Sequence, residues 1–588
     1  MRHNFFRALA AALPLLCVLS VAPPISAQSA AGKSVSLEND APVTLYKNAR
    51  IYTNDPGSPW ASAMLVRGEE ILAVGDEDEL SALAEKGTRV VDLSGHFVMP
   101  GFNDAHVHLG SAGQDALAVR LQGAPTIAEV QKRVAAAVAD AKPGEWITGS
   151  GWDHTLWPEK SFPTHQDLDS VSPNNPVFLV HISGHVAVAN SAALKLAGIT
   201  AKTPNPAGGE IERDAAGEPD GMLKEGAAIS LVRAKIPPPS NDRRKKGIEL
   251  ALADVAASGV TSIQDNSLVD ALGKSSAANA GNDTWDDFLT YRKLKSEGKL
   301  TVRITEWLPF SAPLERLEQM RKEGGTTDPW LRTGALKMVT DGALGSRTAA
   351  MLAPYSDDAK TSGILAMEPE KLKSLAIERD KAGFQLNFHA IGDRANRVAL
   401  DTFEAVAKAN GPRDRRDRIE HAQVVALSDI PRFAALQVIA SMQPSHQTTD
   451  MRWAESRVGP DRIKGAYAWA SMQKFGVRLA FGTDYDVEVI NPFRGLYACV
   501  TRELPDGGPA GGWQPQEKLS LDDCIRAYTT GSAYAEFMEG KKGELKAGEL
   551  ADFIVLSNDL TKIPPSQFTK TSVLLTIVGG RTVYAKIH

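Results

Sequence analysis

Two histidines one residue apart, His106 and His108, close an apolar run in the segment VMPGFNDAHVHLG. In a β-strand, residues two positions apart point to the same side, so both imidazoles could bind one metal ion. Two polar histidines of a core or a surface would give the same pattern. The Pro-Gly-Phe that precedes the pair at the close of a strand favours the metal-binding interpretation.

Two further histidines follow short β-like runs, His389 in FQLNFHAIGD and His421 in RIEHAQ. A single histidine of this kind is more often a core residue. Their separation is that of one βα unit, so two successive strands would each supply one imidazole. Together with the first pair, they predict a cluster of imidazole ligands.

A carboxylate, Asp484, ends the apolar run VRLAFGTDYD. At this position it could bind a metal ion and also accept a proton from metal-bound water, the role of a general base. Because GTD before a turn also suits a helix N-cap, capping is the alternative. We favour the general base.

The amine of Lys337 lies within the apolar run GALKMVTDG. An ammonium group is costly to bury. Because it has only hydrogen-bond donors, it cannot bind a cation. Two interpretations stay open. Lys337 could reach solvent or pair with Asp341, or it could react with carbon dioxide to form a carbamate whose oxygens bridge two metal ions.

Short apolar runs that end in polar residues alternate with longer Ala-, Leu- and charge-rich stretches through most of the chain. This rhythm predicts the α/β class and a (β/α)8 TIM-type barrel, with the polar residues at its catalytic face. Turn-rich stretches predict an insertion over the active face. We expect a β-sandwich domain from 42–98 and 541–588, the barrel over 99–540, and the insertion at about 112–255.

The first 27 residues have the features of a secretory signal peptide. Arg2 and Arg7 precede an apolar run, and small residues lead to Ala27. The run has only about 15 residues, whereas a membrane span needs about 20. We therefore expect cleavage after residue 27 and an exported, periplasmic, soluble protein with no stable membrane span.

Net charge and cysteine content exclude several classes of function. Loss of Arg2 and Arg7 with the signal peptide would change the formal charge from −6 to −8, which disfavours a nucleic-acid partner. Of the three cysteines, Cys499 and Cys524 would remain. They allow one disulfide at most, but neither has a CxxC or His-flanked context, so we expect buried thiols and no cysteine nucleophile.

Six motifs identify a family resemblance when taken in order: MPGFNDAHVH, LKMVTDGALGSRTA, NFHAIGD, RIEHAQ, FGTDYDV and ELADFIVL. From about Val43 to Tyr584 the chain resembles the amidohydrolase superfamily, and specifically the YtcJ-like branch (amidohydrolase family 3), which includes N-substituted formamide deformylases. The resemblance implies that His106 and His108 hold one metal ion and that His389 and His421 hold a second. Carboxylated Lys337 would bridge the two ions, and Asp484 would bind metal and carry protons.

Three segments resemble substrate-side motifs of the same branch: GSGWDHTLWP, HISGHVAVANSAAL and GMLKEGA. The resemblance implies a substrate pocket lined by a group of residues from these segments: Trp152, Asp153, His181, His185, Asn190 and Glu225. An Arg usually stands in the branch where this chain has His181. Because some relatives bridge their metals with a carboxylate, Glu225 is an alternative bridge that would leave Lys337 without a metal role.

The prediction is a metal-dependent hydrolase that cleaves an amide-like, non-peptide C–N bond of a small molecule with a metal-activated hydroxide. Asp484 would act as general base and then acid, and His185 or a backbone N–H would stabilise the oxyanion. We expect two zinc ions, although Mn, Fe or Co would suit the same ligands. An isomerase or lyase, an esterase or lactonase, and a non-catalytic receptor are the alternatives. The substrate and a homodimeric state stay open.

Overall fold

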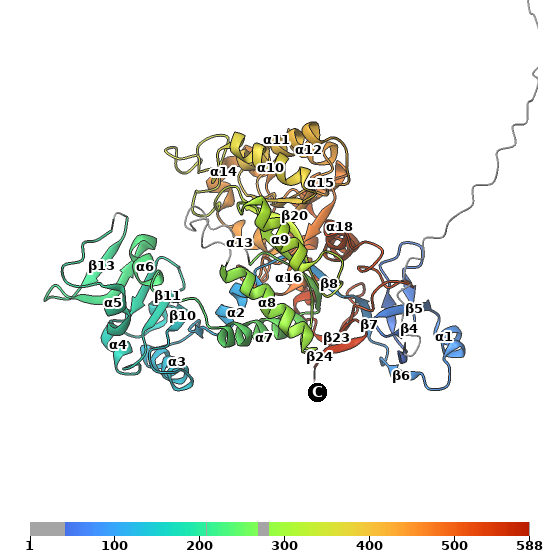
Figure 1. The fold of residues 1–588 in the computed structure, drawn as a ribbon, viewed down its shortest axis with the longest axis horizontal. Coiled ribbons are helices and arrows are strands. Elements are labelled where there is room, and N and C mark those ends of the chain that lie inside the picture. The colour runs from blue at the N-terminus through green and yellow to red at the C-terminus, as the bar shows by residue number, and fades with distance from the viewer. Residues whose placement is uncertain (1–40, 207, 268–281, 587–588) are drawn as a thin grey trace, which may run out of the picture. The chain divides into compact units, whose positions relative to one another are not determined.

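In the computed structural model, the described residues are 41–586, without residue 207 and residues 268–281 (Figure 1). The predicted signal peptide, residues 1–27, lies outside them. The strands are β1 (Val43–Lys47), β2 (Arg50–Tyr52), β3 (Trp60–Ala61), β4 (Ala63–Arg67), β5 (Glu70–Gly75), β6 (Arg89–Asp92), β7 (Phe97–Pro100), β8 (Phe102–Val107), β9 (Val119–Arg120), β10 (Ile147–Trp152), β11 (Val177–His181), β12 (Val186–Ala189), β13 (Glu210–Arg213), β14 (Pro219–Lys224), β15 (Val260–Asp265), β16 (Arg303–Pro309), β17 (Leu331–Val339), β18 (Leu386–Ala390), β19 (Arg418–His421), β20 (Ile439–Met442), β21 (Leu479–Phe481), β22 (Phe553–Leu556), β23 (Val573–Val578) and β24 (Arg581–Ala585).

The α-helices are α1 (Glu77–Leu83), α2 (Leu109–Ala116), α3 (Ile127–Asp140), α4 (His165–Asp169), α5 (Ser191–Ala197), α6 (Glu225–Arg233), α7 (Asn241–Ala257), α8 (Asn282–Ser296), α9 (Leu314–Gly324), α10 (Pro369–Lys381), α11 (Asp393–Asn410), α12 (Ile430–Ala435), α13 (Pro444–Asp450), α14 (Ala454–Arg462), α15 (Trp469–Lys474), α16 (Pro492–Thr501), α17 (Leu521–Arg526) and α18 (Ser532–Ala535). Among these described helices, none is long and apolar enough to cross a lipid bilayer.

Eight parallel strands form the central sheet, in the order β8, β15, β16, β17, β18, β19, β20, β21. The first and last strands meet through a bridge between Val107 and Tyr485. The hydroxyl of Thr483 also donates to the Asp104 carboxylate, 2.6 Å away. The sheet is therefore a nearly closed barrel, which confirms the predicted fold class.

The barrel strands are held by a core between them and the outer helices. Every residue of β16 is buried, as expected for a parallel strand covered on both faces. The Phe388 ring of β18 stacks on Phe403 of α11, with centroids 4.9 Å apart, and Phe310 meets Phe388 edge to face at 5.4 Å. This packing fixes the carboxyl ends of the strands, where the polar residues of the sequence motifs lie.

Strands from both ends of the chain share a sheet. Its order is β24, β23, β22, β7, β2, β3, and a second sheet contains β5, β4, β1 and β6. The ring of Tyr46 in β1 meets Phe553 in β22 edge to face, with centroids 5.0 Å apart, so the two sheets pack through their inner faces. This arrangement is the small β-sandwich of the predicted fold class.

A third sheet forms the insertion, in the order β13, β14, β12, β11, β10, β9 (Figure 1). The predicted insertion range of about 112–255 also includes most of α7, which instead packs against α2 of the barrel. A Cβ atom added at Gly247 of α7 would lie 2.4 Å from the carbonyl oxygen of Gly113 in α2, so this close helix contact requires glycine. The insertion sheet itself runs from β9 to β14.

Cys499 of α16 and Cys524 of α17 form a disulfide, with Cα atoms 6.2 Å apart. The prediction of two buried thiols is therefore wrong, although both residues are fully buried. The packing of α17 against α16 brings the two Cα atoms within disulfide range. Sequence spacing alone does not reveal that contact.

Candidate metal centre

Asp484 lies against the imidazoles of His106 and His108. Its Oδ1 atom is 3.1 Å from Nε2 of His108 and 3.5 Å from Nε2 of His106. One ligand atom from each of the three side chains lies within 4.8 Å of the others. The two histidines come from the carboxyl end of β8, and Asp484 follows β21, so closure of the barrel creates this group.

A second group uses the other oxygen of Asp484, with His421 and His446. Nε2 of His446 is 3.5 Å from Oδ2 of Asp484, and the three ligand atoms again lie within 4.8 Å of one another. Sequence reasoning missed His446. The sequence pattern that could have indicated His446 is IASMQPSH, an apolar run that ends in polar residues. In the structure this run is β20 followed by the start of α13.

His389 lies beside His421, with ring centroids 4.6 Å apart. Its Nε2 atom is 3.4 Å from both the Gly342 carbonyl oxygen and Oδ1 of Asp341. Nδ1 is therefore the nitrogen left to face an ion. The structure brings His389 to the cluster, but His446, and not His389, shares the oxygens of Asp484.

Buried acceptors orient two of the imidazoles. Oε2 of Glu420 lies 2.6 Å from Nδ1 of His106, and Oε1 of Gln443 lies 2.7 Å from Nδ1 of His421. With protons on both Nδ1 atoms, the Nε2 lone pairs face the cluster, as metal-binding histidines require. Glu420 and Gln443 were also missed from the sequence, although Glu420 directly precedes His421 in RIEHAQ.

Lys337 of β17 is buried, with Nζ 3.5 Å from Nε2 of His106. It neither reaches solvent nor pairs with Asp341, whose carboxylate accepts the backbone N–H groups of Ile391 and Gly392 at 3.0 and 2.8 Å. Burial lowers the pKa of Lys337 to about 8, although Glu420 and Asp484 oppose this shift. A larger share of this amine is therefore neutral near pH 7 than in an exposed lysine.

The shifted pKa values favour metal binding at His106, His421 and Asp484, but not at His108, where burial lowers the pKa and the hydrogen bond and charge of Asp484 outweigh it and raise the pKa. Burial, with a further contribution from Lys337, lowers the pKa of His106 to about 4, and burial and His389 place the pKa of His421 well below its ordinary value. Burial opposes ionisation of Asp484, but His106 and His108 outweigh it and hold the pKa of this carboxyl well below its usual range. Neutral imidazoles and an ionised carboxylate are the forms that bind a metal ion.

Buried polar atoms in the cluster lack hydrogen-bond partners. Among the described side chains, they include Oδ1 of Asp484 and Nε2 of His446. Leaving such atoms unpaired is costly, and a cation in each of the two groups would satisfy them. Imidazole nitrogens and a carboxylate are a donor set that zinc prefers, so these residues fit a divalent transition metal.

The backbone at the site adopts unusual conformations. Asp484 has φ 60° and His421 has φ 71°, both in the left-handed region that non-glycine residues rarely occupy. A Cβ atom at Gly482 would lie 2.6 Å from the backbone nitrogen of His106. Glycine in the GTD motif therefore lets the last strand approach the first, and strain of this kind is frequent at functional sites.

Two predicted pocket residues are structural. Trp152 is fully buried in the insertion core, and its Nε1 donates to the Leu179 carbonyl at 3.1 Å. Asn190 caps α5, accepting from Ala193 N at 3.0 Å, and donates to the Asn175 carbonyl at 2.9 Å. Packing and capping therefore use both side chains, and their pocket-lining role stays a prediction.

The remaining predicted substrate residues lie in the insertion. His185 is 72% exposed, and its Nδ1 is 3.1 Å from Oε2 of Glu225. The oxyanion role of His185 and the Glu225 bridge stay predictions. Asp153 and His181 lie near each other at another part of the insertion sheet, with His181 Nε2 3.9 Å from Asp153 Oδ1.

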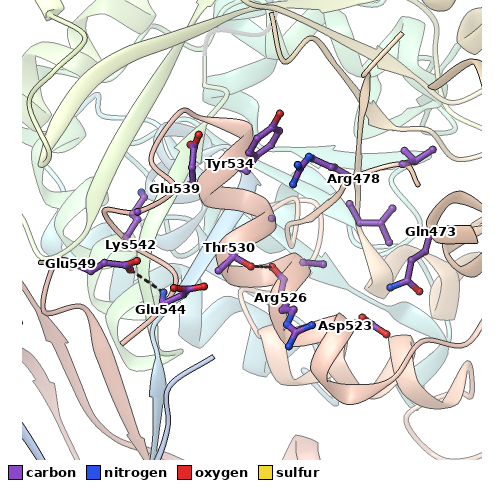
Figure 2. A pocket seen from close by; sticks show the side chains of 15 residues that line it. Gln473, Arg478, Asp523, Arg526, Thr530, Tyr534, Glu539, Lys542, Glu544 and Glu549 are labelled. Carbon is purple, nitrogen blue, oxygen red and sulfur yellow. Dashed lines mark hydrogen bonds between the residues drawn. The ribbon is translucent and has the colours of Figure 1, made fainter. Parts of the chain in front are cut away.

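Figure 2 shows the residues that line a separate cavity of about 480 Å³. Val477 and Arg478, which line it, precede β21, whereas Asp484 follows that strand. Its other lining residues include Thr530 and Tyr534, and none of the clustered histidines. This cavity is therefore distinct from the candidate metal centre.

Comparison with known proteins places the chain in a family. Residues 89–584 match the family model described as "Amidohydrolase family". Protein LONG AFTER FAR-RED 3 of Arabidopsis thaliana is 37% identical over 92% of this chain and 91% of its own length. Putative amidohydrolase YtcJ of Bacillus subtilis is 31% identical over 91% of this chain and 98% of its own length. N-substituted formamide deformylase of Arthrobacter pascens is 30% identical over 92% of this chain and 98% of its own length.

A solved structure shares the fold over most of the chain. It is an uncharacterized metal-dependent hydrolase from Pyrococcus horikoshii, with a TM-score of 0.72 and 29% identity, and it covers 89% of this chain and 99% of its own. The family match and the long alignments confirm the resemblance drawn from the motifs. The chain belongs to the amidohydrolase family and is a hydrolase of that family.

Proposed function

We propose that this chain is an exported, metal-dependent amidohydrolase that cleaves an amide-like C–N bond of a small molecule, with Asp484 as the proton carrier. The observation that carries the proposal is the position of Asp484. One of its oxygens lies 3.1 Å from Nε2 of His108, and the other lies 3.5 Å from Nε2 of His446. The N-substituted formamide deformylase similarity supports a C–N bond as the target.

The proposed metal ligands fall into two sets that share Asp484. His106 and His108 form the first set, and His421 forms the second with His389 or His446. A divalent ion bound by such ligands lowers the pKa of water to about 7 and polarises a carbonyl oxygen. Two zinc ions are our assignment, because the donors are imidazoles and carboxylates.

Asp484 is only 4% exposed, so it acts in a site that excludes most bulk water. The carboxylate takes one proton from the attacking water as the new C–O bond forms. It then delivers that proton to the leaving nitrogen as the C–N bond breaks. The products are a carboxylic acid and an amine, and the carboxylate is restored for the next cycle.

Lys337 is proposed to bridge the two ions as a carbamate. The neutral amine would attack carbon dioxide, forming an N–C bond and releasing one proton. The resulting anion has two oxygens where the ammonium had only donors. Support comes from Nζ lying 3.5 Å from Nε2 of His106 while the side chain is buried away from solvent.

Export is proposed from two features. Residues 1–27 carry Arg2 and Arg7 before an apolar run, in the pattern of a signal peptide. The Cys499–Cys524 disulfide is typical of proteins in an oxidising compartment. Mass measurement of the protein from the periplasmic fraction tests this: a mature chain that begins at residue 28 is expected, and an uncleaved cytosolic chain would contradict export.

His185 and Glu225 stay as candidates for substrate contact. They form an exposed pair at the end of the insertion sheet where β12 begins and β14 ends. Loops carried by a rigid scaffold often supply specificity. Their substitution is expected to change the preference among substrates more than the metal content.

The reaction class is tested with metal-depleted and zinc-reloaded enzyme on a panel of N-formyl amines, N-acyl amino acids, cyclic imides and aryl esters. Hydrolysis of an amide-like member only after reloading, with oxygen from labelled water in the acid product, is expected. Turnover without solvent oxygen in the product would indicate an isomerase or lyase. Turnover of aryl esters alone would indicate an esterase.

A further inference from the structure

Asp153, His154 and His181 gather at one edge of the insertion sheet, outside the proposed catalytic centre. Asp153 and His154 follow β10, and His181 ends β11. The two strands are parallel, and Trp152 pairs in register with His181, so both strand ends meet at this edge. One ligand atom from each of the three side chains lies within 4.8 Å of the others.

Two imidazole nitrogens in this cluster are buried without a hydrogen-bond partner among the described residues. They are Nδ1 of His154 and Nε2 of His181. Nδ1 of His181 contacts two atoms of Ser183. The hydroxyl oxygen Oγ lies 2.8 Å away, and the backbone N–H donates to Nδ1 at 3.1 Å. Because the Ser183 N–H donates to Nδ1, a neutral His181 carries its proton on Nε2, which lies 3.9 Å from Oδ1 of Asp153. A metal ion bound through Nε2 would displace this proton.

Aromatic side chains lie against two sides of the cluster. The ring of Trp152 lies 4.5 Å from the ring of His181, and Phe162 lies 4.3 Å from His154, measured between centroids. Apolar walls of this kind limit the positions of the imidazole rings. They also lower the local dielectric constant, which strengthens the attraction between a cation and the Asp153 carboxylate.

A purely structural role accounts for only part of the arrangement. Oδ1 of Asp153 accepts from Thr155 N at 2.9 Å and from Thr155 Oγ1 at 2.6 Å, which is the geometry of a helix cap. This role leaves Oδ2 for another partner. Capping does not account for Nδ1 of His154 and Nε2 of His181, which are buried without a hydrogen-bond partner among the described residues.

We propose that Asp153, His154 and His181 bind one divalent transition metal ion, separate from the barrel ions. Two imidazoles and one carboxylate favour zinc and leave a fourth position for water or another ligand. The ion would tie the segment after β10 to the end of β11. The proposal concerns metal binding in the insertion and does not depend on the proposed hydrolytic function.

The test uses the whole protein, stripped of metal and titrated with Zn²⁺ alone, with zinc content and amide hydrogen exchange as the readouts. His154→Gln and His181→Gln are expected to lose one zinc ion per chain relative to the unsubstituted protein. Removing a direct ligand should weaken this site by more than about 100-fold, because even an outer partner of a ligand contributes about 10–100-fold. His96→Gln, in the turn between β6 and β7, is the matched control.

Zinc should slow amide exchange over residues 150–156 and 178–185 in the unsubstituted protein and in His96→Gln, but not in the two ligand variants. Peptides that contain the barrel histidines should keep their zinc-dependent protection in all four proteins. Asp153→Asn replaces any ligand variant that does not fold, because its side-chain oxygen can still cap Thr155. Unchanged zinc content in the ligand variants, or no protection of these segments in the unsubstituted protein, would overturn the proposal.

Discussion

Oε2 of Glu420 lies 2.6 Å from Nδ1 of His106, and both side chains are completely shielded from solvent. Burial alone would raise the pKa of Glu420, but Arg418, whose Nε is 2.6 Å from Oε1, and His106 outweigh it and lower the pKa to about 2. Glu420 is therefore an anion that fixes the His106 ring and makes its other nitrogen a better metal donor.

Replacing Glu420 by Gln tests this relationship. The amide keeps the shape but loses the charge, so zinc affinity is expected to fall by about 10–100-fold. A competition titration with a chelating dye measures the change. Glu404→Gln, at an exposed residue that pairs with Arg432, should keep the original affinity. Equal affinities in the two variants would show that Glu420 does not support the metal site.

His446 is expected to hold the second ion together with His421. His446→Gln should therefore lose one zinc ion per chain and lower turnover by more than about 10-fold, because its Nε2 is otherwise a buried atom without a partner. Metal analysis of His446→Gln and His389→Gln side by side measures the difference. If only His389→Gln loses the ion, His389 is the ligand that joins His421, as the sequence predicted, and the assignment of His446 is wrong.

Lys337 should carry a carbamate in the metal-loaded enzyme. Protein reloaded with zinc in ¹³C-bicarbonate is expected to give a carbamate signal in the ¹³C spectrum. Lys337→Gln should lack the signal and bind less metal, since its amide cannot react with carbon dioxide. Lys464→Gln, at an exposed position, is the control. A zinc-loaded enzyme that is active but shows no such signal would rule out the carbamate.

The stability of the protein should fall as pH rises through neutrality, in part because of Asp417. Burial, reinforced by Asp380, raises the pKa of Asp417 to about 7, although the Leu386 N–H opposes the shift. At pH values between the pKa of Asp417 in the unfolded chain and its pKa in the folded protein, the folded state binds one more proton than the unfolded state. The stabilisation from this proton is therefore present at low pH and is lost as pH rises through about 7.

Asp417→Asn keeps an acceptor for Leu386 but cannot ionise. Between pH 5 and pH 8 the Tm of the variant should fall less than that of the unsubstituted protein, and the removed effect is at most about 3 kcal/mol over this pH range. Asp461→Asn, whose side chain is 93% exposed, should follow the unsubstituted protein. Parallel pH dependence in all three proteins would contradict the raised pKa.

The sequence predicted the barrel because its strands are apolar runs that end in chemically distinctive residues. RIEHAQ and VRLAFGTD correspond to β19 and β21, and each ends near a clustered side chain. His446 was missed because β20 is short and the histidine lies in the helix after it, beyond the strand end. Glu420 was missed because its partner, His106, is distant in sequence, and pairing of this kind depends on barrel closure.

The insertion was harder to interpret. Its Trp152 and Asn190 match motifs, but motif matching does not distinguish a side chain that packs or caps from one that faces a ligand. Cys499 and Cys524 illustrate the same limit, since helix packing decides whether two cysteines meet. Contacts between elements therefore account for most of what the sequence did not predict.

Asp484→Asn tests the proposed chemistry most directly. Asparagine keeps one oxygen for the metal but cannot accept the proton, so hydrolysis of the best amide substrate should fall by about 10²–10⁴-fold while the zinc content stays close to that of the unsubstituted enzyme. Turnover and zinc per chain are measured on the same preparation, with Asp461→Asn as the control. Full hydrolytic activity in zinc-loaded Asp484→Asn would contradict the assignment of Asp484 as the proton carrier.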